Sequence, residues 1–249
     1  EAEKNKLGGA NNLTIKDGGQ KASLFEIGKD LSLLPLDYGD SSLVGYWDFE
    51  EATGTIVYDR SGNGRNGVFL SSPIWTAGCS KGSCLEFDNV DDGVSIPSFT
   101  FAGASDYTMM AWAKIKGSHK NYTGTIMSSG NWNSAHWALG ISQSNTIFQT
   151  RKADGASSPT LSRTFSLNAW HFVALVRSGT SISFYVNGAR IGGATITNGV
   201  LVSDATNMTI GRETYANGYF DFNGFIDEPR IYNRALSATE VQALYSAVR

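Results

Sequence analysis

Short segments of alternating hydrophobic and polar residues recur along the chain from Leu43 onward. They are rich in Val, Ile, Thr and aromatic residues, which favour β-strands, and turn residues separate them. Strands are expected in the stretches LVGYWDF, SCLEFD, GVSI, YTMMAWAKIK, GTIMSS, HWALGIS, NTIFQTRK, WHFVALVRS, MTIGRE and FNGFIDEPRIYN. Many short strands at this spacing predict an all-β fold, an antiparallel β-sandwich.

Local signals place two turns and one helix within this pattern. Residues 170–192 contain a first turn at Ser178-Gly179 and a second at Asn187-Gly188, where Asn-Gly predicts a type I′ hairpin. Near the end of the chain, Ser237 and Glu240 have the spacing of a capping box. The residues VQALYSAV that follow carry apolar side chains at helical spacing, so one short C-terminal helix is expected.

Residues 1–42 differ from the rest of the chain. They contain two Gly-Gly pairs, many polar residues and no aromatic residue before Phe25. This composition predicts an irregular arm or linker, with one short helix or strand near Leu24–Ile27. Pro35 marks a turn into the main domain, which we expect over residues 43–249.

Composition and charge narrow the function classes. Hydrophobic residues make up 41% of the 249 residues, charged residues only 17%, and there are 28 glycines, which argues against disorder and against a helical bundle. The net charge is -3 and no basic run exists, so a nucleic-acid partner is not expected. No apolar stretch approaches the roughly 20 residues that span a membrane. Because the chain begins with Glu1, we expect a mature or trimmed fragment, with membrane contact only through a missing N-terminal segment.

The only two cysteines, Cys79 and Cys84, lie in the stretch CSKGSC. Their spacing predicts a disulfide that closes a small hairpin loop and contributes about 2 kcal/mol. The alternative is a pair of free thiols. A disulfide implies an exported protein, so an extracellular or cell-surface location is expected.

Four motifs resemble one fold family in the right order. These are LVGYWDFEEATGTIVYDRSGNGRNGVF, LEFDNVDDGVSI, WHFVALVRSGTSISFYVNGARIG and FNGFIDEPRIYNRALSATEVQALY. Together they resemble laminin G-like, concanavalin A-type jelly-roll domains over residues 43–249. That family usually has Val after IDE, whereas this chain has Pro229, which predicts a kink or an edge position there.

A weaker resemblance covers residues 5–40 of the arm. NKLGGA, DGG and FEIGKDLSLLP resemble the segment after the N-terminal helix of some bacterial type IV pilin-like proteins that carry a laminin G-like domain. This resemblance implies filament self-assembly. An ordinary linker in a larger surface protein is the alternative.

The candidate metal chemistry lies in the loop Asp59-Arg-Ser-Gly-Asn-Gly64. Calcium takes six to eight oxygen ligands from carboxylates, amides and backbone carbonyls. The family resemblance implies calcium where the opening segment meets the closing IDE strand, with Glu50, Asp59, Asn63 and Asp227 as ligands. Asx-turn chemistry, with no ion, is the alternative reading of this loop. A second acidic candidate is the turn that contains Asp88, Asp91 and Asp92.

Sugar binding needs aromatic faces beside placed polar groups. The segment Asn131-Trp-Asn-Ser-Ala-His-Trp137 offers both, and Trp132 and His136 are the predicted ligand-facing residues. A core position for Trp132 and Trp137 is the alternative. Tyr215 and Asn217, in a later Gly-containing loop, are expected at a neighbouring rim.

Enzymatic chemistry finds little support in the sequence. Retaining and inverting glycosidases use two carboxylates across a cleft. The nearest approach to such a pair is Asp48-Phe-Glu50-Glu51, while Asp227 and Glu228 point to opposite faces if their strand is regular. We therefore expect a non-catalytic, calcium-stabilised adhesion domain with a glycan or cell-surface ligand. The alternatives are a structural pilin subunit and a glycoside hydrolase-like enzyme.

Overall fold

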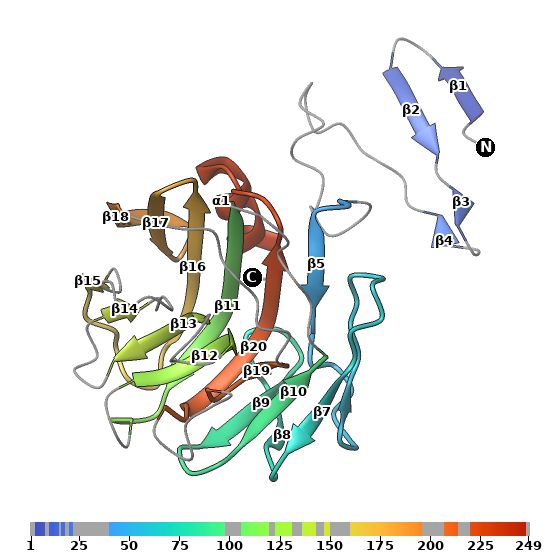
Figure 1. Ribbon diagram of the computed structural model, residues 1–249. Coiled ribbons are helices and arrows are strands. Elements are labelled where there is room, and N and C mark those ends of the chain that lie inside the picture. The colour runs from blue at the N-terminus through green and yellow to red at the C-terminus, as the bar shows by residue number, and fades with distance from the viewer. Residues whose placement is uncertain are drawn as a thin grey trace.

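The computed structural model describes residues 3–7, 10–14, 16–17, 20–21, 40–97, 106–119, 123–130, 136–142, 147–149, 160–195, 207–213 and 220–247. Two antiparallel sheets form a sandwich, and one short helix follows the last strand (Figure 1). The predicted all-β class and the C-terminal helix are thus confirmed. Among the described residues, no helix is long and apolar enough to cross a membrane.

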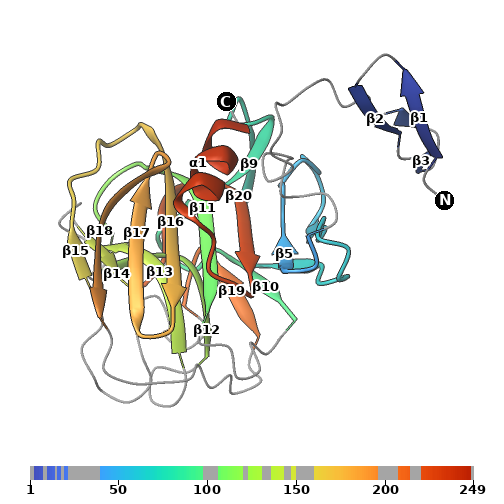
Figure 2. The ribbon, with the colours of Figure 1, turned by 90° about the horizontal axis from the view of Figure 1, so that it is seen from above.

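The helix-side sheet carries α1 (Ala238–Ala247) on its outer face (Figure 2). Its strands run in the order β18 (Ala189–Thr195), β17 (Ser181–Val186), β16 (Trp170–Ser178), β11 (Tyr107–Ile115), β20 (Asn223–Tyr232), β9 (Ser83–Asp88) and β8 (Ile74–Ala77). In addition, β5 (Leu43–Tyr46) pairs with β20.

The opposite sheet runs in the order β15 (Thr160–Ser162), β14 (Ile147–Gln149), β13 (His136–Ser142), β12 (Thr123–Gly130), β19 (Met208–Ile210), β10 (Gly93–Ile96), β7 (Gly67–Leu70) and β6 (Ile56–Val57). The sequence did not predict β6, β7 and β8 as strands. They have only two to four residues each, too few for a clear alternation. They are recognised as strands by their pairing with β7, β10 and β9.

Two hydrophobic cores explain why β11 is apolar at nearly every position. Met109, Ala111 and Ala113 face the core between the two sheets, whereas Met110 and Trp112 face the second core under α1. A strand buried on both faces has no polar side to alternate with. The same alternation places Lys114, two residues beyond Trp112, on the outer face of this sheet.

The structure confirms two features that the sequence predicted from residues a few positions apart, a tight turn and a helix cap. Asn187 and Gly188 both have positive φ, 51° and 78°, as a type I′ turn requires. At the start of α1, the N–H of Ser237 donates to Oε2 of Glu240 at 2.7 Å, and the N–H of Glu240 donates back to Oγ of Ser237 at 3.3 Å. This reciprocal pair is the predicted capping box.

The arm contains two short hairpins within its described residues. One pairs β1 (Glu3–Leu7) with β2 (Ala10–Thr14), and the other pairs β3 (Lys16–Asp17) with β4 (Gln20–Lys21). The arm is therefore less irregular than its composition predicted. The element expected near Leu24–Ile27 lies outside the described residues.

The pairing of β20 is irregular near Glu228 and Pro229. On one side β20 pairs with β11, and the register shifts between Met110 and Trp112, so Glu228 and Pro229 face one residue of β11. On the other side β9 pairs with the first half of β20 and β5 with the second half. Pro229, which has no N–H to donate, thus lies at a β-bulge, and the predicted kink is found there.

Candidate functional site

A tight loop between β8 and β9 is closed by the predicted disulfide between Cys79 and Cys84. This disulfide loop comprises residues 78–84. The N–H of Cys79 donates to the carbonyl oxygen of Gly82 at 3.2 Å. Gly82 has a φ of 54°, and a Cβ there would lie 2.2 Å from Oε2 of Glu50. Glycine therefore allows the loop to approach this carboxylate closely.

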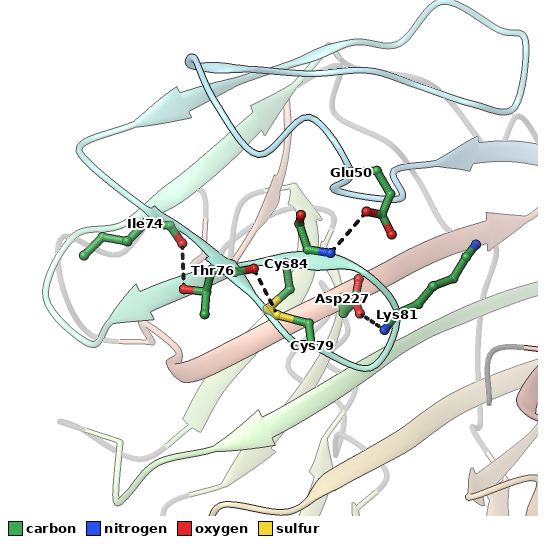
Figure 3. Close-up of a disulfide and its surroundings, with 8 residues drawn as sticks. Glu50, Ile74, Thr76, Cys79, Lys81, Cys84 and Asp227 are labelled. Atoms are coloured by element: carbon green, nitrogen blue, oxygen red, sulfur yellow. Dashed lines mark hydrogen bonds between the residues drawn. A yellow bond between two sulfur atoms is a disulfide. The ribbon is translucent and has the colours of Figure 1, made fainter.

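The disulfide loop presents backbone N–H groups to two carboxylates from distant parts of the chain. The N–H of Ser83 donates to Oε2 of Glu50 at 3.1 Å, and the N–H of Lys81 donates to Oδ2 of Asp227 at 3.0 Å. Figure 3 shows Glu50, from the opening segment, and Asp227, from β20, beside this loop. The structure thus places two of the four predicted calcium ligands at one loop.

The bulge in β20 adds a third carboxylate. Glu228 is fully buried. Its Oε1 accepts a bond from Nζ of Lys81 at 3.2 Å, and its Oε2 accepts bonds from the Tyr46 hydroxyl at 2.8 Å and from the Arg230 guanidinium. Asp227 and Glu228 would point to opposite faces of a regular strand, but β20 is irregular at this position. With a φ of 55° at Glu228, the bulge brings both carboxylates to Lys81.

Asp227 is the group whose ionisation this environment changes most. Burial raises the pKa of Asp227 to about 8, and the negative charges of Glu228 and Glu50 add to the effect, against the N–H bond from Lys81. Its second oxygen, Oδ1, is buried and accepts no hydrogen bond. An unpartnered carboxylate oxygen beside a second carboxylate fits a hard cation, which would displace the proton.

Asp59 and Asn63, the other two predicted ligands, lie in a separate loop. Oδ1 of Asp59 accepts N–H bonds from Tyr46 at 3.1 Å and Ser61 at 2.9 Å, and Oδ2 accepts one from Arg65 at 2.9 Å. Nδ2 of Asn63 donates to Oγ of Ser61. These contacts match the Asx-turn alternative, and a metal role for the two residues stays a prediction.

The second acidic candidate keeps its side chains together. The carboxylates of Asp88, Asp91 and Asp92 lie within 4.8 Å of one another. Asp92 is buried, and its oxygens accept N–H bonds from Ser72 at 3.0 Å and Asp88 at 3.1 Å. Burial also raises the pKa of Asp92. These bonds give Asp92 a structural role in the turn between β9 and β10, and a metal role for the three residues stays a prediction.

Most of the predicted sugar-facing residues fall outside the described part of the chain. This holds for Trp132, Tyr215 and Asn217, and for the side chain of His136, whose backbone begins β13. Trp137 is 2% exposed and belongs to the core between the sheets, as the core alternative expected.

Glu50 and Glu51, the adjacent glutamates considered for an enzyme, form hydrogen bonds with different loops. Glu50 accepts the bond from Ser83, whereas Oε1 of Glu51 accepts bonds from the Tyr58 N–H at 3.0 Å and the Arg60 guanidinium at 3.2 Å. Sequence reasoning missed Lys81 and Glu228 as site residues. The position of Lys81 between the two cysteines was the one local signal that could have pointed to it.

Fold and site together define an antiparallel sandwich whose closing strand meets the opening segment at a cluster of acids. Residues 88–242 match the family described as the concanavalin A-like lectin/glucanases superfamily, and the chain belongs to that superfamily. The match leaves out the arm, whose pilin-like resemblance and filament role stay predictions. No curated protein matches the chain.

Solved structures of several binding domains and enzymes are similar in fold. The botulinum neurotoxin serotype D binding domain has a TM-score of 0.65 at 16% identity, over 83% of this chain and 52% of that one. Domain 4 of an extracellular arabinanase from Geobacillus stearothermophilus, in complex with arabinotriose, has a TM-score of 0.63 at 16% identity, and the match covers 82% of this chain and 98% of that domain. Trypanosoma rangeli sialidase in complex with sialic acid has a TM-score of 0.63 at 19% identity, and the match covers 82% of this chain and 33% of the sialidase chain. This chain thus spans about half of the neurotoxin chain and a third of the sialidase.

Proposed function

We propose that this chain is a non-catalytic carbohydrate-binding domain that acts outside the cell. The observation that carries the proposal is the similarity to the arabinanase domain, which extends over 98% of that domain and 82% of this chain. A domain of the same extent, solved with an oligosaccharide, supports a sugar ligand for this member of the same fold. The disulfide between Cys79 and Cys84 supports an oxidising, extracellular setting.

The burial of the carboxylates favours binding over hydrolysis. Asp227 and Glu228 have no exposed surface, and the disulfide loop donates hydrogen bonds to both. A glycosidase must place its two carboxylates on either side of a polysaccharide bond. Carboxylates covered in this way suit a structural or metal-binding role better.

Calcium is the cation that we propose for Glu50 and Asp227. The donor set is made of hard oxygens, and Oδ1 of Asp227 has no hydrogen-bond partner. A divalent cation would offset the repulsion between the two carboxylates, which raises the pKa of Asp227. Bound calcium would thereby hold the opening segment, the disulfide loop and β20 together.

The test is a glycan array probed with the purified chain, once in calcium and once in EDTA. Binding to a defined sugar class supports the carbohydrate-binding function, and its loss in EDTA supports the role of calcium. The double variant Glu50→Gln/Asp227→Asn should bind as the wild type does in EDTA. Absence of glycan binding on the array in both conditions refutes the proposed function. Release of reducing sugar from a polysaccharide by the purified chain would favour the enzyme alternative.

A further inference from the structure

Five strands of the helix-side sheet place one residue each in a single row across its outer face. Lys114 of β11 is opposite Trp170 of β16 and Phe225 of β20, Phe225 is opposite Glu86 of β9, and Glu86 is opposite Ile74 of β8. Neighbouring strands lie 4.7–4.9 Å apart, so the row is about 19 Å long. We call these five residues the outer row.

The outer row lies beyond the part of the sheet that α1 covers. Two residues before Lys114 on β11, Trp112 stacks on Tyr245 of α1, with ring centroids 5.6 Å apart. In the outer row itself, Ile74 is 60% exposed, and the other four residues are half-buried. The row therefore presents large side chains partly to solvent, and Trp170 also packs against the edge of the core under α1.

Lys114 lies between the two aromatic residues of the outer row, and a second ammonium group, that of Lys116, lies beside the row. The ring centroids of Trp170 and Phe225 are 6.3 Å apart. Nζ of Lys114 lies 5.1 Å from the Phe225 centroid, and Nζ of the exposed Lys116 lies 5.7 Å from it. Such positions over a ring face are attractive for a cation and hold it in place.

The charges of this surface do not cancel. Lys116 forms an ion pair with Glu86. Among the described residues, Lys114 has no carboxylate partner within 4.0 Å. The ammonium group of Lys114 thus lies over the Phe225 ring, with its charge available to an anion.

The composition of the row indicates what kind of partner it fits. Cores of protein interfaces are depleted of Lys and Glu, whereas Lys114 and Glu86 flank the central Phe225 of this row. Sugar sites instead combine an aromatic face with a few placed polar groups. The positive charge of Lys114, between Trp170 and Phe225 in the row, selects a sugar that carries a negative charge.

We propose that the outer row binds an acidic glycan, with a sugar ring on Trp170 and the sugar carboxylate at Lys114. This inference rests on the proposed carbohydrate-binding function and adds the binding surface and the class of ligand. The negative charge of Glu86 would repel the ligand carboxylate, and it also neutralises the charge of Lys116. Removal of Glu86 should therefore strengthen binding, an effect that a merely structural residue would not have.

The experiment measures binding to immobilised uronate and sialylated oligosaccharides, each beside its methyl-esterified or neutral counterpart. We expect binding to the acidic forms, weakened by added salt. Lys114→Gln should weaken it roughly tenfold to hundredfold, as expected for a lost charged hydrogen bond. Trp170→Ala should weaken it roughly tenfold, and Glu86→Gln should strengthen it.

Matched controls lie outside the row. Arg163→Gln removes an exposed cation and Tyr58→Ala an exposed aromatic ring, and both should bind as the wild type does. Melting curves of all variants check that the fold is intact. Acidic binding that Lys114→Gln and Trp170→Ala leave unchanged overturns the outer row as the site. Binding of neutral glycans alone also overturns the inference but keeps the proposed function, whereas no binding to any glycan refutes both.

Discussion

Replacement of Asp227 by Asn is the sharpest test of the acid cluster beside the disulfide loop. Burial and the charges of Glu50 and Glu228 raise the pKa of Asp227 from its ordinary value of 3.8 to about 8, while Lys81 donates to it. Between these two pH values the folded state holds a proton that the unfolded state has lost. The contribution of Asp227 to the free energy of unfolding of the calcium-free protein therefore falls as pH rises through this interval.

The size of this loss follows from the same two values. Each pH unit in the interval removes about 1.4 kcal/mol, so the total is roughly 6 kcal/mol. A small domain has about 5–15 kcal/mol of stability, so the calcium-free wild type should be marginal at pH 8. Asn resembles the protonated acid and cannot ionise. The variant Asp227→Asn should match the wild type near pH 4 and exceed it by several kcal/mol near pH 8.

The assay is urea unfolding in EDTA at a series of pH values from 4.5 to 8.5, with the disulfide intact. Glu86→Gln, which removes a carboxylate outside the cluster, is the matched control and should keep the wild-type slope. Parallel pH curves for wild type and Asp227→Asn would refute the reasoning. With calcium added at pH 8, the wild type should regain stability and Asp227→Asn should not, because binding to the folded state alone stabilises it.

Three further changes test the surrounding contacts. Replacing Cys79 and Cys84 together by Ser should lower the free energy of urea unfolding by about 2 kcal/mol and weaken the calcium response. Asp59→Ala leaves three backbone N–H groups without their acceptor and should cost roughly 2–4 kcal/mol in urea unfolding, and loss of the calcium-induced rise in Tm in this variant would support Asp59 as a ligand. Burial lowers the pKa of His119 from 6.5 to about 4, so this group alone lowers the unfolding free energy by roughly 3 kcal/mol on acidification between these pH values, opposite in sign to the contribution of Asp227. His119→Asn, which keeps an acceptor for the Asn223 N–H, lacks this contribution and should gain stability over the wild type as pH falls toward 4 in acid titrations followed by circular dichroism.

Sequence predicted those features of the fold that depend on residues a few positions apart. The turn at Asn187 and Gly188, the cap formed by Ser237 and Glu240, and the disulfide loop each rest on short-range geometry. Positive φ, a reciprocal hydrogen bond and a short covalent loop are local requirements. For this reason residue types and spacing were sufficient to predict them.

The acid cluster and the outer row depend instead on the register between distant strands. Pro229 indicated an irregular strand, but only the pairing with β11 shows a bulge that turns Glu228 toward Lys81. Trp170 and Phe225 are neighbours because both are opposite Lys114. A shift of one residue in either strand would turn these side chains into the core. No pattern within a single strand contains that information.

The acid cluster and the outer row are joined by one strand, and this makes them mutually dependent. Phe225 and Asp227 are two residues apart on β20 and lie on the same side of the sheet, while Ile226 between them is buried in the core. Any cation that draws Asp227 and the disulfide loop together also fixes the part of β20 that carries Phe225. Linkage is reciprocal, so a ligand ordered on the outer row must tighten cation binding by the same factor by which the cation tightens the ligand. Under the proposed function, the bulge in β20 would thus support the binding face.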